Sequence, residues 1–202
     1  MSKVTTCWSC KGPLSSAGLF CPTCGAVSAI IESNPFTLFG LPTGFDVDLK
    51  ALEHRYFSLS RQLHPDRFAT KGPQTMMLAL QHTASLNDAY ATLKDDLNRA
   101  IYMLRAQGVT AFDEAGQGKT PPALMATSFE LHEQLEDATT PQALQSLLTH
   151  VKKQRTACLK NLSDAFAKYD TEAATQATLE LKFLTGFERE WHRKNKRIKD
   201  SA

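Results

Sequence analysis

Apolar residues recur at alternating steps of three and four positions between residues 49 and 63, which is the spacing of one side of an α-helix. This side is made by Leu49, Leu52, Tyr56, Leu59 and Leu63. At about a hundred degrees per residue, the opposite side carries Lys50, His54, Phe57 and Arg61. The pattern predicts an amphipathic helix of about four turns whose exposed face is basic and holds one aromatic ring.

The tripeptide His64-Pro65-Asp66 follows this pattern directly. Proline disfavours helical angles in the residue before it and has no amide hydrogen to donate, so the helix is expected to end at His64. The imidazole and the carboxylate are then displayed on a stiff corner that suits recognition by another protein. Such a tripeptide is also an ordinary helix stop, so its surroundings decide the interpretation.

Further helices are predicted on both sides of this corner. A helix over residues 74–94 meets the first apolar stripe with Ala79, His82, Leu86, Tyr90 and Leu93. The two helices together form a helical hairpin. Asn34 and Pro35 begin a short capped helix ahead of the hairpin that ends near Gly40, and residues 97–104 form one more short helix behind it.

Two Cys-x-x-Cys turns, separated by ten residues, stand near the start of the chain. They contain Cys7, Cys10, Cys21 and Cys24. This spacing favours one tetrahedral metal ion with sulfur ligands at about 2.3 Å, and we expect one structural zinc per chain. Gly12 and Gly25 follow the two pairs, where the backbone is expected to need positive φ. Residues 1–30 hold few large apolar side chains, so the metal is expected to supply the folding energy.

Two alternatives for the cysteine pairs stay open. The thiols can form disulfides in an oxidising compartment, although twin Cys-x-x-Cys pairs favour zinc. The string Cys21-Pro-Thr-Cys24-Gly25 also resembles half of a rubredoxin iron site, which makes a redox module the other choice. Cys158 stands alone in a helical pattern and is expected to be a small buried hydrophobic residue.

The second half of the chain predicts a linker and an antiparallel bundle of three helices. Residues 106–121 interrupt the periodicity and form the linker. Its Gly118-Lys119-Thr120 lacks the glycine, strand and helix of a phosphate-binding loop, so nucleotide binding is not expected. Helices are predicted from 123 to 136, from 141 to 169 and from 171 onward, joined by short connections. The apolar stripes of the last two helices comprise Leu144, Leu148, Val151, Cys158, Leu162, Ala165, Tyr169, Ala173, Ala177, Leu181, Leu184 and Trp191.

The first helix of this bundle carries apolar residues outside its core stripe of Leu124, Leu131 and Leu135. Met125 and Phe129 project away from that stripe, beside acidic residues. Phe183 likewise lies off the seam of the third helix. Apolar groups bordered by charge mark protein-binding surfaces, although a wide helix stripe that buries Met125 is the alternative.

Composition narrows the functional class. The chain has 202 residues, 42% of them hydrophobic and 22% charged, and 23 basic against 21 acidic residues leave a net charge of +2. This balance argues against a nucleic-acid binder, and the basic residues at 193–199 are interpreted as a solvated helix end. No apolar run is long enough to span a membrane. The first six residues hold no signal-like run, so a cytoplasmic location with reduced thiols is expected.

Residues 34–105 resemble a J domain, because the segments NPFTLFGLP, HRYFSLSRQLHPDRFA and SLNDAYATLKDDLNRAIYML occur in the order that this family shows. HPDRFA, NDAY and RAIYML resemble more narrowly the HscB-type co-chaperones of iron-sulfur cluster assembly. The resemblance implies a protein that is not itself an enzyme but binds a DnaK/HscA-type chaperone and stimulates its ATPase. The residues implied in that contact are Lys50, His54, Arg55, Arg61, His64, Pro65, Asp66 and Arg67.

The same resemblance implies that the C-terminal bundle binds the IscU-type scaffold protein on which clusters are assembled. The residues implied are Leu124, Met125, Phe129, Glu130, Glu133, Asp137 and Phe183. Ala126 departs from the pattern, since the family often has methionine there. Some HscB-type proteins also carry a tetracysteine extension ahead of the J domain.

The sequence therefore predicts an all-α protein with a zinc ribbon-like module at 1–30, a J domain at 34–105, a linker at 106–121 and a three-helix bundle at 122–202. A J-protein with other clients and a redox or metal-handling protein are the rival interpretations.

Overall fold

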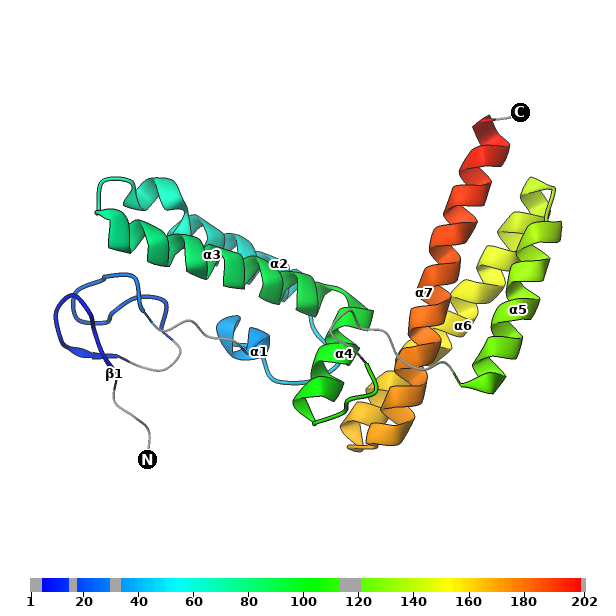
Figure 1. Ribbon diagram of the computed structural model, residues 1–202, viewed down its shortest axis with the longest axis horizontal. Coiled ribbons are helices and arrows are strands. Elements are labelled where there is room, and N and C mark those ends of the chain that lie inside the picture. The colour runs from blue at the N-terminus through cyan, green and yellow to red at the C-terminus, as the bar shows by residue number, and fades with distance from the viewer. Residues whose placement is uncertain (1–4, 15–17, 30–33, 113–120, 201–202) are drawn as a thin grey trace. The chain divides into compact units, whose positions relative to one another are not determined.

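The computed structural model of the chain describes residues 5–14, 18–29, 34–112 and 121–200 (Figure 1). In these ranges the secondary structure comprises seven α-helices, one 3-10 turn and two strands of two residues each. The predicted all-α class is confirmed. The chain divides into two units, Met1–Asp95 and Asp96–Ala202, which are described separately.

The helices of the first unit are α1 (Pro35–Leu38), α2 (Leu49–Leu63) and α3 (Pro73–Lys94), with the 3-10 turn η1 (Pro65–Phe68) between α2 and α3. Local side chains explain where they begin. The Asp48 carboxylate accepts hydrogen bonds from the amides of Lys50 at 2.9 Å and Ala51 at 3.1 Å, which caps α2. The Asn34 side chain caps α1 in the same way. The three predicted helices are confirmed, and their bounds differ from the expected ones by at most about two residues.

The helical hairpin of α2 and α3 is closed by leucines and by a pair of stacked rings. Leu52, Leu63, Leu86 and Leu93 are fully buried. Tyr56 stacks on Tyr90 with ring centroids 4.1 Å apart, and the Tyr56 hydroxyl donates to the Asn87 side chain at 3.0 Å. Leu49 was expected in the buried stripe, and that prediction is wrong. It is the first residue of α2 and remains exposed, because the stripe meets α3 only from Leu52 onward.

The second unit contains α4 (Asp96–Ala106), α5 (Pro122–Asp137), α6 (Pro141–Ala167) and α7 (Thr171–Asp200). Figure 1 shows the two longest helices, α6 and α7, side by side in opposite directions. Their seam buries Leu144, Val151, Cys158, Leu162, Leu181, Leu184 and Trp191. The Trp191 indole donates to the carbonyl of Leu144 at 2.7 Å. The three predicted helices of the bundle are therefore present.

The helix α4 ends the stretch that resembles a J domain, and it packs against α7 in the second unit. Its first residue, Asp96, binds two guanidinium groups. The carboxylate oxygens lie 2.7 Å from Arg99 and 2.9 Å from Arg155 of α6. The pair with Arg155 ties α4 to α6, whereas the pair with Arg99 lies within α4.

Two predicted core positions of the bundle are wrong. Helix α6 ends at Ala167, and Tyr169 takes a φ of 56° that turns its side chain out to 82% exposure. Its amide and that of Asp170 donate back to Phe166 and Ala165, which closes the helix with a left-handed residue. Ala173 is exposed and Ala174 is buried instead, because Ala174 precedes the buried Ala177 and Leu181 by three and seven residues and so lies on the buried side of α7.

The predicted linker comprises residues 106–121. Of these, residues 113–120 lie outside the described residues. The part that is described contains Phe112, which is buried. Among the described helices, none combines the length and the apolar character that crossing a membrane requires.

Candidate functional site

The two cysteine turns have the same backbone geometry. The amide of Cys7 donates to the Gly12 carbonyl at 2.8 Å and the amide of Lys11 donates to Cys7 at 3.0 Å. In the second turn the Cys21 amide donates to Ala26 at 2.8 Å and the Gly25 amide donates to Cys21 at 2.9 Å. Each pair of bonds holds one Cys-x-x-Cys segment as a rigid knuckle, so both sulfurs of a pair point the same way.

The residue after the second cysteine of each knuckle adopts the left-handed conformation. Gly25 has a φ of 72°, as predicted, but in the first knuckle the residue is Lys11, with a φ of 61°. The prediction for Gly12 is therefore wrong by one position. Gly12 is required for a different reason, since a Cβ there would lie 2.9 Å from Thr23 Oγ1 and 3.2 Å from Cys10 Sγ. The glycine lets the two knuckles approach each other.

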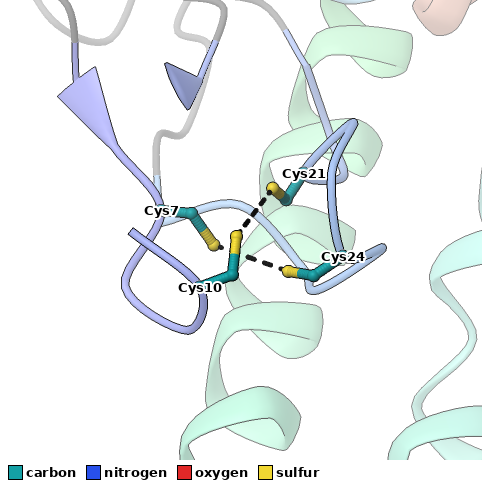
Figure 2. A group of neighbouring side chains, drawn as sticks. All are labelled: Cys7, Cys10, Cys21 and Cys24. Atoms are coloured by element: carbon teal, nitrogen blue, oxygen red, sulfur yellow. Dashed lines mark hydrogen bonds between the residues drawn. The ribbon is translucent and has the colours of Figure 1, made fainter. Parts of the chain in front are cut away.

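Figure 2 shows the four cysteine side chains converging on one point. The Sγ atoms of Cys7 and Cys24 are 3.8 Å apart, those of Cys10 and Cys21 are 3.7 Å apart, and all four lie within 4.8 Å of one another. A tetrahedral ion with metal–sulfur bonds of about 2.3 Å separates its sulfurs by about 3.8 Å. All five cysteines of the chain are free thiols, so the disulfide alternative does not hold here. The four sulfurs therefore fit one tetrahedral metal ion.

Backbone amides around the sulfurs favour the thiolate form that a metal needs. The Ser9 amide lies 3.4 Å from Cys7 Sγ, and the Gly12 amide lies 3.4 Å from Cys10 Sγ. The amide of Cys24 is the largest cause that lowers the pKa of the Cys21 thiol to about 6. For Cys10 the Gly12 amide acts in the same direction, but the Cys24 thiol and burial together raise its pKa to about 12. A metal ion that binds these sulfurs displaces the protons of the thiols.

The two knuckles and the segment that follows them as far as Ser28 are called the cysteine module. Hydrogen bonds hold this module together and connect it to the helical hairpin. The indole of Trp8 donates to the Val27 carbonyl at 2.9 Å, which links the first knuckle to the segment after the second. The next residue, Ser28, has its carbonyl 2.8 Å from Nε2 of His82 in α3. His82 was expected on the apolar side of α3 and is buried there. Its role as the anchor of the module was missed, since periodicity shows burial but not the partner.

The corner after α2 presents both of its polar side chains to solvent. His64 ends α2 with a φ of −54° and a ψ of 125°, as expected before a proline. Its Nδ1 lies 3.4 Å from the Asp66 amide and 3.6 Å from the Asp66 carboxylate. The side chains of His64 and Asp66 are 59% and 90% exposed. An imidazole and a carboxylate held this way are available to a partner.

The outer face of α2 leads up to this corner and is basic. Lys50, His54 and Arg61 are exposed, and so is the ring of Phe57. A hollow of about 450 Å³ beside the corner is lined by Phe57, Ser60, Arg61 and His64. In η1, Arg67 is exposed and Pro65 is half-buried. The basic face, the hollow and the corner form one continuous surface of the first unit, which we call the corner surface.

Arg55 differs from the other basic residues of α2. Its Nη1 donates to the carbonyls of Phe39 and Gly40 at the end of α1. These bonds satisfy the carbonyls that the short helix leaves open and hold α1 against the hairpin. Arg55 therefore has a clear structural use inside the first unit.

In the second unit, α5 exposes two large apolar side chains. Met125 is 59% exposed and Phe129 is 72% exposed, so the alternative that buries Met125 is wrong. Leu124 is half-buried, and the carboxylates of Glu130, Glu133 and Asp137 are exposed along the same helix. Phe183 of α7 is half-buried, with its ring centroid 6.0 Å from that of His132 in α5. We call Leu124, Met125, Phe129 and Phe183 the apolar surface of the bundle.

Most of the chain matches known proteins. Residues 120–192 match the family model described as the HSCB C-terminal oligomerisation domain. A co-chaperone protein HscB homolog from Cupriavidus taiwanensis is 37% identical over 176 residues, which are 84% of this chain and 98% of the relative. The human iron-sulfur cluster co-chaperone protein HscB is 29% identical over 191 residues, which are 93% of this chain and 81% of the relative.

A comparison with solved structures also finds HscB proteins. The crystal structure of the human co-chaperone protein HscB superimposes with a TM-score of 0.86 at 28% identity, over 95% of this chain and 98% of that one. The chaperone HscB from Vibrio cholerae has a TM-score of 0.74 at 33% identity, over 82% of this chain and 99% of that one.

Proposed function

This chain belongs to the HscB family of co-chaperones, and from that premise we propose that it delivers an iron-sulfur cluster scaffold protein to a DnaK/HscA-type chaperone. The first unit would dock on the chaperone ATPase through the corner surface. The second unit would hold the IscU-type scaffold on its apolar surface. In this proposal the chain itself catalyses no reaction, because its role is to bring the ATPase and the client together when ATP is hydrolysed.

The observation that carries the proposal is the exposed corner at His64 and Asp66. Pro65 restricts the backbone there, so little conformational entropy is lost when a partner binds the two side chains. The positive charges of Lys50 and Arg61, which lie on the same surface as His54, complement an acidic partner and raise the association rate.

The apolar surface supports the second half of the proposal. Exposed Met125 and Phe129 have apolar area to bury, and a fully buried side chain of this size contributes about 1.5–3 kcal/mol. The carboxylates of Glu130, Glu133 and Asp137 would form a charged rim around it. A scaffold with a complementary apolar patch and basic rim fits this surface.

We assign zinc to the four sulfurs, one ion per chain, with a structural role. A closed set of four cysteines leaves no open position for catalysis. Iron in the same ligand set is the alternative. Metal analysis of the purified protein distinguishes them, since zinc gives a colourless protein and iron gives a visible, redox-dependent absorption.

The test is ATP hydrolysis by the cognate chaperone, measured against the concentration of this chain with and without the scaffold protein. The wild type is expected to raise the rate, and more so with scaffold present. His64→Gln is expected to abolish the stimulation, whereas His150→Gln, an exposed histidine of α6, is the matched control. Full stimulation by His64→Gln would refute the assignment of the corner.

A further inference from the structure

The side chain of His132, a residue of α5, points toward α7. Both of its ring nitrogens face acceptors. Nδ1 is 2.6 Å from the carbonyl oxygen of Ser128, one turn earlier in α5, with the Ser128 hydroxyl farther away at 3.5 Å. Nε2 is 2.8 Å from a carboxylate oxygen of Glu190 in α7. A neutral imidazole has a single N–H, so the ring donates to both acceptors only when both nitrogens carry a proton.

The same ring lies beside two phenylalanines of α7. The ring centroid of Phe187 is 5.6 Å away with its plane nearly perpendicular, and that of Phe183 is 6.0 Å away and tilted. Phe187 is buried, whereas Phe183 is half-buried. Edge-on and tilted ring contacts of this kind stabilise aromatic groups in a defined relative position. His132 thus contacts Phe183 directly and bonds to a carboxylate on the same helix as Phe183.

His132 also follows Phe129 by three residues, so the two side chains are neighbours along α5. The apolar surface combines residues of two helices, Met125 and Phe129 from α5 and Phe183 from α7. Another polar contact between these helices is made by Lys194 of α7, whose Nζ donates to the carbonyls of Leu135 and Glu136 at 2.6 Å each. It holds the end of α5, whereas His132 acts next to the apolar surface.

We propose that His132 is a positioning residue for client binding, which joins the α5 and α7 halves of the apolar surface. By donating to Glu190 and contacting Phe183, it fixes where the Phe183 ring lies relative to Phe129 before the partner arrives. A surface assembled in advance loses less entropy on binding. This inference rests on the proposed function, since the partner is taken to be the scaffold protein.

The test measures scaffold affinity by calorimetry alongside the melting temperature. His132→Ala is expected to weaken binding about tenfold, and Glu190→Gln, which removes the charge but keeps an acceptor, about threefold. His132→Gln, whose amide nitrogen can occupy the place of Nε2, is expected to recover part of the loss. His150→Ala, an exposed histidine of α6, is the matched control and is expected to bind like the wild type.

A double-mutant cycle separates positioning from a general loss of stability. If His132 acts by placing Phe183, then adding His132→Ala to Phe183→Ala weakens binding by less than about twofold further. Effects of the two substitutions that multiply independently would overturn the inference, because His132 would then act elsewhere. Should His132→Ala fail to fold, Glu190→Gln in the Phe183→Ala background provides the same comparison.

Phe129→Ala distinguishes this inference from the proposed function. If Phe129→Ala weakens scaffold binding and the His132 and Glu190 variants do not, the positioning role is wrong and the surface stands. If Phe129→Ala also leaves the affinity unchanged, the proposed scaffold surface itself is wrong.

Discussion

His82→Ala is expected to separate the cysteine module from the helical hairpin. The His82 side chain is 1% exposed in α3, and its Nε2 lies 2.8 Å from the carbonyl of Ser28, which is 54 residues earlier in the chain. Ser28 follows Val27, whose carbonyl accepts from the indole of Trp8 in the first knuckle. This buried hydrogen bond thus connects the segment with the four cysteines to the hairpin that carries His64.

The expected loss of stability follows from two contributions. The hydrogen bond contributes about 1 kcal/mol net, and deleting a buried ring leaves a cavity that costs about 2 kcal/mol or more. Among the described residues, Nδ1 of His82 has no hydrogen-bond partner, so removing it recovers part of the cost of burial. We therefore expect a net loss of about 2–3 kcal/mol. For a unit of this size, a loss of that order lowers the melting temperature by about 10–20 °C.

The assay combines thermal unfolding with hydrogen exchange, each on metal-loaded and chelator-treated protein. In the wild type, removing the metal is expected to reduce protection of the α3 amides around His82, because the module is then no longer held in place. In His82→Ala the α3 amides are expected to exchange equally fast with or without metal. His54→Ala, an exposed histidine in α2, is the stability control.

Two results would refute this reasoning. A melting temperature for His82→Ala within about 2 °C of the wild type would mean that the buried bond contributes little. Protection of α3 in the wild type that does not respond to metal removal would mean that the module and the hairpin are independent.

Three further predictions concern the other sites. Gly12→Ala is expected to weaken metal binding about tenfold or more in chelator competition, because its Cβ would lie 2.9 Å from Thr23 Oγ1, and an unchanged affinity would show that the knuckles can separate freely. Phe129→Ala is expected to weaken scaffold binding about tenfold or more by calorimetry while leaving the melting temperature unchanged, since the side chain is largely exposed. Burial raises the pKa of the Cys158 thiol to about 12, so in mass spectra it is expected to resist alkylation at pH 8 until the protein unfolds, and rapid labelling of the native protein would contradict its burial.

The helices and the cluster of four cysteines were largely predictable because their signals are local. The leucines of α2 recur at steps of three and four residues, and prolines occupy the first positions of α1, α5 and α6. Both signals lie within a few residues of the chain. The errors occurred where a pattern reached the end of an element. Leu49 lies beyond the edge of the α2–α3 contact, and Tyr169 terminates α6 in a left-handed conformation that periodicity does not reveal.

By itself, the amino-acid sequence determined where the helices lie, that four cysteines would gather, and that His64 and Asp66 would stand on a bend after α2. Each of these depends on backbone preferences or on short spacings. Only the tertiary structure decided which side chains join distant segments. Arg55 closing α1, His82 holding Ser28 and His132 binding Glu190 are hydrogen bonds between groups far apart in the chain. No local pattern specifies such partners, because a buried donor finds its acceptor only when packing brings the two segments together.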